Sequence, residues 1–212
     1  MTPRANREAA GVVEMRVGLP EPPPPALDPY LDAAVRCFVR YGVHRTSVQD
    51  VAAEMKVNRT TVYRQVGNVD AMLRLVNARA VHRIVEEAFR RADPASVSAH
   101  TVVQLLADLI EMVRSDPVVG KVLGDELDLV GTLVADLPAM IERVVAAVTP
   151  GLEAAMRSGR LARGDARSLA EWMTRIGGSC ILAPPPGDLR AFLAEVLVPV
   201  LTPAGLGSVP AN

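Results

Sequence analysis

The sequence predicts an all-α fold, and three observations support that class. Half of the 212 residues are apolar but only 3% are aromatic, so the core has to be built from aliphatic side chains, as in helix bundles. Apolar residues recur at the spacing of a helix face along most of the chain, and no segment shows the alternation of a half-buried strand. Clusters of Gly and Pro separate the helical segments. A chain of this length forms one or two compact units.

Residues 1–26 precede the first helical pattern and are expected to form a flexible N-terminal arm. The segment contains three arginines and ends in a run of prolines, which favours an extended backbone. Two interpretations stay open, an arm that contacts DNA and an untethered tail. The segment lacks the apolar region of a signal peptide, and no later run approaches the roughly 18 apolar residues of a membrane span. We therefore expect a cytoplasmic protein with no membrane segment.

The first helix is expected from about residue 27 to Gly42. It begins near Pro29, which suits the first turn of a helix, and ends at a glycine, which suits the position after the last turn. Its apolar face recurs at helical spacing and consists of Tyr30, Ala34, Cys37, Phe38 and Tyr41.

Two short helices are expected next. Thr46 and Ser47 each stand three residues before a residue that completes a capping-box pattern, Gln49 and Asp50. The following helix is barely two turns long and carries the apolar stripe Val48, Val51, Ala52 and Met55. After a turn at Lys56 and Val57, Asn58 is the expected N-cap of a second short helix, which ends near Val66 with Val62 and Val66 facing inward.

A longer fourth helix is expected to follow Gly67, with Asn68 as its N-cap and Asp70 near its positive end, and to run to about residue 91. Beyond it the punctuation predicts helices at 97–114, 117–123, 127–135, 138–157, 166–182 and 189–201. Pro150 lies inside one of them and is expected to kink it, because proline removes a backbone donor.

The two short helices, packed on a longer one, predict a helix-turn-helix, in which the second short helix enters the DNA major groove. Small apolar residues at Ala52, Val57 and Val62 let the helices cross closely. The outward residues offer donors for base edges and phosphates, and arginine is suited to guanine. The predicted DNA-binding residues are Ser47, Gln49, Lys56, Asn58, Arg59, Thr60, Thr61, Tyr63 and Arg64.

The segment from Tyr30 to Leu73 resembles the DNA-binding domain of TetR-family transcriptional regulators. The residues that carry the resemblance are Ala33-Ala34, Phe38, Gly42, Thr46-Ser47 and Thr61-Val62-Tyr63. The sequence departs from the family pattern at the turn, where Lys56 replaces Gly, and at Gln65, Val66 and Val69. Val69 stands where the family commonly has a phosphate-contacting Lys, so that contact is not expected here.

The resemblance implies a helix-turn-helix DNA-binding domain over 27–68 and a helical ligand-binding and dimerisation domain over 69–212. It implies a homodimer on a palindromic operator in double-stranded DNA, acting as a repressor that an apolar or amphipathic small molecule releases. Candidate pocket residues are Leu105, Leu109, Met112, Leu133, Met140, Ile141 and Val144. Candidate dimer residues are Trp172, Ile176, Leu193, Val196, Leu197 and Val200. Each of these residues can equally belong to the chain's own core.

Charge is distributed unevenly about a formal net value of -1. Residues 28–92 hold 11 Lys and Arg against 7 Asp and Glu, whereas residues 93–212 hold 9 against 14. A basic front part before an acidic body fits a nucleic-acid reader joined to a second domain. The acidic part also leaves open a helical regulator that binds a protein and needs no small-molecule ligand.

No enzyme is expected. The chain has no Gly-rich phosphate loop, no nucleophile elbow and no metal-ligand spacing, so we assign no catalytic residue, metal or cofactor. His44, His82 and His100 lack an evident partner in the sequence. Cys37 and Cys180 are far apart and are expected to be buried thiols of a protein in a reducing compartment.

Overall fold

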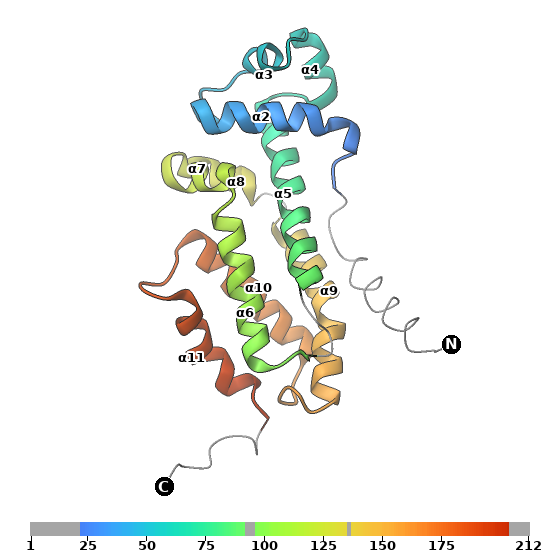
Figure 1. Cartoon of the computed structure of the whole chain (residues 1–212), viewed down its shortest axis with the longest axis vertical. Helices are drawn as coiled ribbons and strands as arrows, with labels where there is room; N and C mark the ends of the chain where they lie inside the picture. Colours follow the sequence, from blue (N-terminus) through green and yellow to red (C-terminus); the bar gives the residue numbers. More distant parts are fainter. Residues whose placement is uncertain (1–21, 92–95, 135–136, 204–212) are drawn as a thin grey trace, which may run out of the picture. The chain divides into compact units, whose positions relative to one another are not determined.

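The computed structural model of the chain describes residues 22–91, 96–134 and 137–203, all helix, turn or loop, without a strand among them. Helices therefore make up the regular structure of the described chain, as the sequence predicts (Figure 1). Most of the predicted arm lies outside the described residues. In its described part, residues 22–24 have no regular secondary structure, and a 3-10 turn follows at Pro25–Leu27.

The described chain folds as two compact units. The N-terminal unit takes its described residues from Pro20–Val85 and Met112–Leu137, and the C-terminal unit takes them from Glu86–Glu111 and Pro138–Asn212. One continuous helix, α5 (Val69–Arg91), contributes its first part to the N-terminal unit and its last turns to the C-terminal unit. The helix-turn-helix thus shares a unit with segments that follow much later in the sequence.

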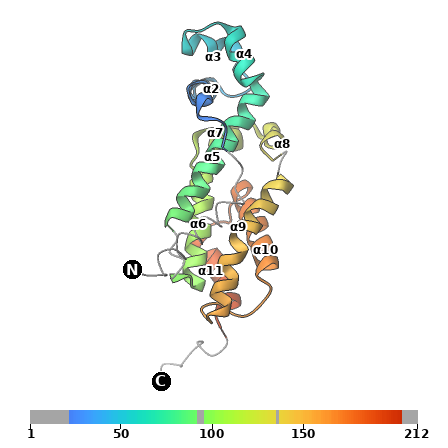
Figure 2. The same ribbon diagram turned by 90° about the vertical axis from the view of Figure 1, so that its right-hand side faces the viewer.

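In the N-terminal unit, α3 (Val48–Met55) and α4 (Arg59–Val66) pack against each other and against α2 (Asp28–Tyr41) (Figures 1 and 2). The unit also contains α7 (Pro117–Asp125), the 3-10 turn η3 (Leu127–Leu129) and α8 (Val130–Leu133). Its core is aliphatic around one aromatic ring, that of Phe38. The sequence predicts a single helix at 127–135, but the described part of that range is divided between η3 and α8.

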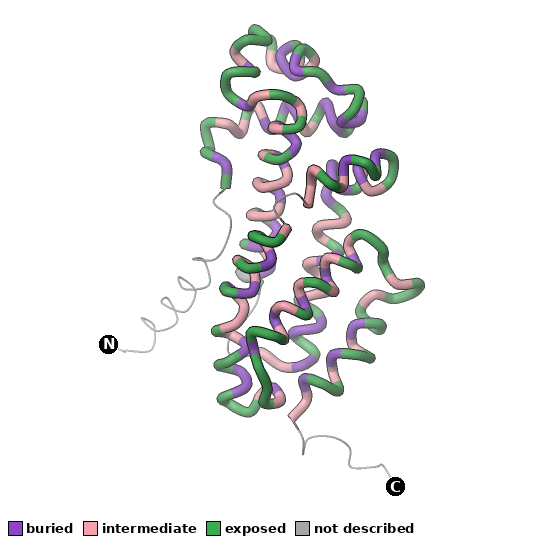
Figure 3. The backbone as a smooth tube through the Cα atoms, turned by 180° about the vertical axis from the view of Figure 1, so that it is seen from behind, coloured by how far each residue is buried: buried purple, intermediate pink, exposed green. Residues whose placement is uncertain are grey.

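The C-terminal unit is built from most of α6 (Ala99–Arg114), together with α9 (Leu137–Arg157), α10 (Ala166–Leu182) and α11 (Leu189–Leu201). Asp165 and Asp188 cap α10 and α11, since Asp165 accepts hydrogen bonds from the Arg167 and Ser168 N–H groups and Asp188 accepts one from the Ala191 N–H. Buried, half-buried and exposed positions alternate along these helices, as in amphipathic helices (Figure 3). The helix α9 is continuous through Pro150.

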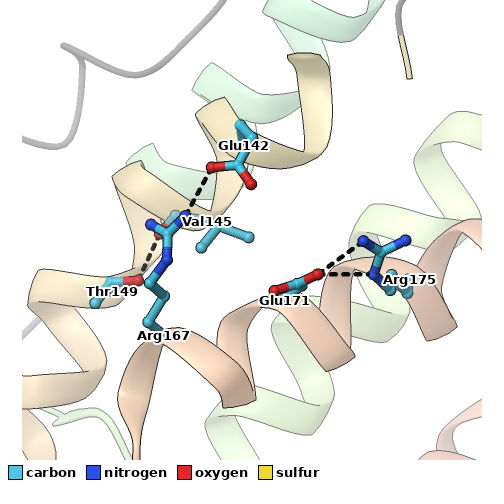
Figure 4. Close-up of polar contacts among 6 residues, drawn as sticks. All are labelled: Glu142, Val145, Thr149, Arg167, Glu171 and Arg175. Atoms are coloured by element: carbon cyan, nitrogen blue, oxygen red, sulfur yellow. Dashed lines mark hydrogen bonds and ion pairs between the residues drawn. The ribbon is translucent and has the colours of Figure 1, made fainter. Parts of the chain in front are cut away.

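Polar contacts on the surface of the C-terminal unit connect its helices. Arg167 of α10 donates to Glu142 of α9 at 2.7 Å, while Glu171 and Arg175 pair within α10 (Figure 4). Arg190 of α11 pairs with Asp108 of α6 at 2.7 Å. Exposed ion pairs of this kind contribute about 0–1 kcal/mol each, so the apolar core holds the unit together.

Candidate DNA-reading surface

The helix α3 begins with a complete capping box. The Ser47 hydroxyl accepts a hydrogen bond from the Asp50 N–H, and the Asp50 carboxylate accepts one from the Ser47 N–H at 2.8 Å. Hydrogen bonds from Ser47 hold the pKa of Asp50 below its usual value. Of the two caps that the sequence suggests, Ser47 is the one used. Thr46 is buried, and its hydroxyl donates to the Gly42 carbonyl at 2.7 Å.

The turn between α3 and α4 rests on Lys56, whose φ of 57° and ψ of 40° are left-handed. Its N–H bonds back to the carbonyls of Ala52 and Ala53, which closes the last turn of α3. Glycine is the residue that adopts this conformation without steric cost. The substitution noted in the sequence therefore leaves the turn geometry intact and puts a strained, positively charged residue between the two helices.

Asn58 caps α4 as predicted, since its side chain accepts a hydrogen bond from the Thr60 N–H at 2.9 Å. Val62 and Val66 are buried, which fixes the rotation of α4 about its axis. Val57, in contrast, is 39% exposed and does not belong to the inner face that the sequence assigns to it. The turn at Lys56 and Val57 is present as predicted, but the left-handed Lys56 redirects the chain just before Val57 and leaves the Val57 side chain exposed.

The opposite face of α4 offers a polar row to solvent. Arg59, Thr60, Tyr63 and Arg64 are exposed, with Tyr63 at 59%, whereas Thr61 is half-buried. Ser47, Gln49 and Lys56 are exposed beside them in the same unit. Most of the predicted DNA-binding residues are thus accessible on the two short helices.

The arginines around this surface fall into two groups. Arg36 and Arg40 of α2 pair with Glu54 of α3, and the bond from Arg36 lowers the pKa of that carboxyl. Among the described residues, no carboxylate pairs with Lys56, Arg59 or Arg64. These three cations are therefore available to phosphates and guanines.

Arg45 is a further cation near this surface and is not among the predicted DNA-binding residues. Arg45 lies in the turn before α3, where its Nε donates to the Tyr41 carbonyl at 2.7 Å. Arg40, Tyr41, Arg45 and Asp50 line an open hollow beside the N-terminus of α3. A basic residue just before a helix N-terminus is a signal for anion binding that the sequence contains.

Comparison with known proteins agrees with this geometry. Residues 31–76, from α2 into α5, match the family described as bacterial regulatory proteins of the tetR family. An uncharacterized HTH-type transcriptional regulator of Mycobacterium tuberculosis is 27% identical over 151 residues, which span 71% of this chain and 77% of that protein. The chain therefore resembles TetR-family transcriptional regulators, most directly in its DNA-binding segment.

The fold of solved TetR-family proteins extends this likeness to nearly the whole chain. A TetR-family transcriptional regulator from Pectobacterium atrosepticum aligns with a TM-score of 0.64 at 18% identity and covers 93% of each chain. SmeT of Stenotrophomonas maltophilia, in a complex with triclosan, aligns with a TM-score of 0.58 at 19% identity, over 87% of this chain and 97% of SmeT. At these identities the likeness concerns the fold.

The candidate pocket residues are divided between the two units. Met112 and Leu133 belong to the N-terminal unit, and the other five belong to the C-terminal unit. Within the C-terminal unit, Ile141 is buried in the core, while the half-buried members are Leu105, Leu109, Met140 and Val144.

The candidate dimer residues also differ in exposure. Leu193 and Leu197 are each 1% exposed, so they pack inside the chain and have no area to offer a partner. Ile176 is half-buried. The large apolar side chains that α10 and α11 expose are Trp172, Leu182, Phe192, Val196 and Val200. Leu182 and Phe192 were not among the predicted residues.

Two further features, a cluster of metal-ligating side chains and a membrane-spanning helix, are not found among the described residues. Within 22–91, 96–134 and 137–203 no three His, Cys, Asp or Glu side chains gather as they would around a metal ion. Over the same ranges, no helix combines the length and the apolar character that crossing a membrane requires.

Proposed function

We propose that the chain is a TetR-family regulator that acts as a dimeric repressor in the cytoplasm. It binds a palindromic operator in double-stranded DNA through α3 and α4 and leaves the operator when an apolar or amphipathic small molecule binds. The observation that carries the proposal is the exposed polar row of α4, held outward by the buried Val62 and Val66 and by the Asn58 cap.

The side chains of α4 suit two kinds of DNA contact. Arg59 and Arg64 are accessible and free of carboxylates in the described chain, and a guanidinium binds the O6 and N7 atoms of guanine in bidentate fashion. Thr60 and Tyr63 offer hydroxyls that fix register on phosphates. Arg45 and Lys56 add charge beside the helices and make binding depend on salt.

Exposed apolar side chains on α10 and α11 support the dimer. Val196 and Val200 are 45% and 63% exposed and lie one helical turn apart on α11, while Trp172 of α10 is 42% exposed. Monomeric proteins seldom expose large contiguous apolar patches to solvent. A two-fold dimer would cover them and present two copies of α4 to major grooves about 34 Å apart.

The effector is proposed to act through α5, because this helix runs without a break from the DNA-binding segment of the N-terminal unit into the C-terminal unit. We assign the binding role to half-buried apolar residues of the C-terminal unit, Leu105, Leu109, Met140 and Val144. Flexible Met side chains adapt to irregular ligands. SmeT, which shares the fold, forms a complex with triclosan. In this proposal, residues 27–68 form the DNA-binding domain and residues 69–212 form the ligand-binding and dimerisation domain.

Selection of duplexes from a random library by the full chain tests the proposal, followed by footprinting of the recovered sequence. We expect an inverted repeat whose half-sites lie about 10 base pairs apart or a multiple of that. A screen of apolar and amphipathic compounds should then find one that releases the duplex. A folded protein that enriches no sequence at moderate salt and instead co-purifies with a protein partner would favour the protein-binding alternative.

A further inference from the structure

Three polar residues are buried in the described chain, and all three belong to one part of the N-terminal unit. They are Thr46, Asp116 and Glu126. Thr46 lies in the turn between α2 and α3, Asp116 caps the start of α7, and Glu126 follows the end of α7. Burying a polar group is unfavourable unless its hydrogen bonds are satisfied. The hydrogen bonds of these three side chains therefore fix the arrangement of the backbone around them.

The Glu126 carboxylate binds the backbone of the α2–α3 turn. Its Oε2 accepts a hydrogen bond from the Val43 N–H at 2.8 Å, and its Oε1 accepts one from the His44 N–H at 3.0 Å. The Glu126 residue is 8% exposed, and Val43 is 1% exposed. No Lys, Arg or His of the described chain pairs with this carboxylate, so backbone dipoles alone hold its charge.

Gly42 makes this contact sterically possible. Its φ is +85°, and a Cβ built there would stand 2.8 Å from Oε1 of Glu126. Any other residue would therefore meet both a strained backbone and the carboxylate. On the other side of the turn, the Thr46 hydroxyl donates to the Gly42 carbonyl at 2.7 Å. The turn is thus fixed from both sides just before α3 begins.

A second buried carboxylate, that of Asp116, lies at the start of α7. Asp116 Oδ1 accepts hydrogen bonds from the Val118 and Val119 N–H groups, and its Oδ2 lies 3.6 Å from the Arg83 guanidinium of α5. Val118 and Val122 of α7 pack into the core shared with α2, α3 and α4. Of these two carboxylates, Glu126 is the one that ties α7 to the α2–α3 turn by hydrogen bonds, whereas Asp116 caps α7 and pairs with an exposed arginine.

We propose that Glu126 is a positioning residue for DNA reading, which sets the direction in which α3 and α4 leave α2. A buried charge without a counter-ion is a poor way to gain stability, because an apolar residue of similar size avoids the desolvation penalty. Two charge-assisted hydrogen bonds, however, impose a direction that apolar packing does not. This role rests on the sequence-selective DNA binding proposed above.

The test uses full-length Glu126→Gln and Glu126→Leu, with Asp128→Asn as the matched control. Asp128 lies two residues after Glu126 and contacts the same turn, since its carboxylate pairs with the His44 ring at 2.7 Å. Unlike the Glu126 contact, that pair is exposed. The probe is the duplex that the wild-type chain selects. We expect affinity to fall about ten-fold in Glu126→Gln, which keeps one acceptor, and further in Glu126→Leu, with Asp128→Asn within about two-fold of wild type.

Two further measurements separate positioning from stability. Hydrogen exchange of the Val43 and His44 amides should accelerate in both Glu126 variants while circular dichroism and the folded fraction stay as in wild type. Gly42→Ala should weaken binding more in the wild-type background than in Glu126→Leu, because the clash with the carboxylate is absent there and only the backbone strain remains.

The outcomes are distinguishable. Unchanged amide exchange in Glu126→Gln would show that the carboxylate does not hold the turn, and faster exchange with wild-type affinity would show that holding it does not matter for DNA. Either result overturns the positioning role. If the wild-type chain itself selects no duplex, the proposed function fails first, and the exchange measurement still decides whether Glu126 holds the turn.

Discussion

Ser47 and Asp50 cap α3 reciprocally, with the Ser47 N–H 2.8 Å from the Asp50 carboxylate and the Asp50 N–H 3.3 Å from the Ser47 hydroxyl. The hydrogen bonds from Ser47 keep the pKa of Asp50 below its usual value in the folded protein. The contribution of the ionised carboxylate is therefore complete above the pKa of the unfolded chain, and it is lost as the pH falls through the lower folded value.

Asp50→Asn should remove that pH-dependent contribution. Urea unfolding at neutral pH should find the variant less stable than wild type, and the difference should shrink as the pH is lowered through the range in which Asp50 titrates. The Ser47→Ala variant, which lacks the hydroxyl, should lose about 1 kcal/mol at neutral pH. A wild-type advantage over Asp50→Asn that is constant from neutral to acid pH would contradict this account of the cap.

Lys56→Gly and Lys56→Ala separate the strain of the turn from its charge. Both remove the ammonium, but only glycine relieves the left-handed backbone at φ 57°. We expect Lys56→Gly to raise the free energy of unfolding by about 1 kcal/mol relative to Lys56→Ala. If Lys56 contacts a phosphate, both variants should lower the slope of log affinity against log salt by about one. Equal stability of the two variants would contradict the role assigned to the turn.

The two thiols should be inert in the folded protein. Burial raises the pKa of Cys37 and of Cys180, which keeps both as neutral thiols, and only the thiolate is an effective nucleophile. Ellman's reagent at neutral pH should therefore label neither thiol in the native chain and both in denaturant. Rapid labelling of one cysteine under native conditions would show that its helix opens readily.

Val196→Asp should dissociate the dimer. The Val196 side chain is 45% exposed on α11, and a carboxylate placed there would be desolvated in a dimer but solvated in a monomer. Sedimentation velocity should find wild type as a dimer and the variant as a folded monomer. Ala146→Asp, at an exposed position of α9, serves as the control. If the Val196→Asp variant is still a dimer, the interface does not include Val196 and lies elsewhere on the chain.

Local signals explain which elements the sequence predicts well. The bounds of α10 and α11 agree with the prediction, because Asp165 and Asp188 cap their starts and a proline, Pro184 or Pro203, lies two residues after each end. The Asn58 cap and the buried Val62 and Val66 were likewise visible in short-range patterns.

Long-range contacts explain the misses. The helix predicted at 127–135 is divided in its described part, and Glu126 just before it has non-helical backbone angles and bonds to a turn more than 80 residues earlier. No local pattern encodes that contact. Leu193, Leu197 and Val196 all fit the same helical stripe, and only the packed structure separates the buried pair from the exposed valine.

The central claim, that α4 reads DNA, is tested most directly by the affinity of four chains for the selected duplex and for a scrambled duplex of the same composition. The chains are wild type, Arg59→Ala, Arg64→Ala and the control Arg163→Ala, whose exposed arginine belongs to the C-terminal unit. We expect wild type and Arg163→Ala to prefer the selected duplex equally, and at least one α4 variant to lose about 1–3 kcal/mol of that preference. Undiminished preference in both α4 variants would contradict the claim.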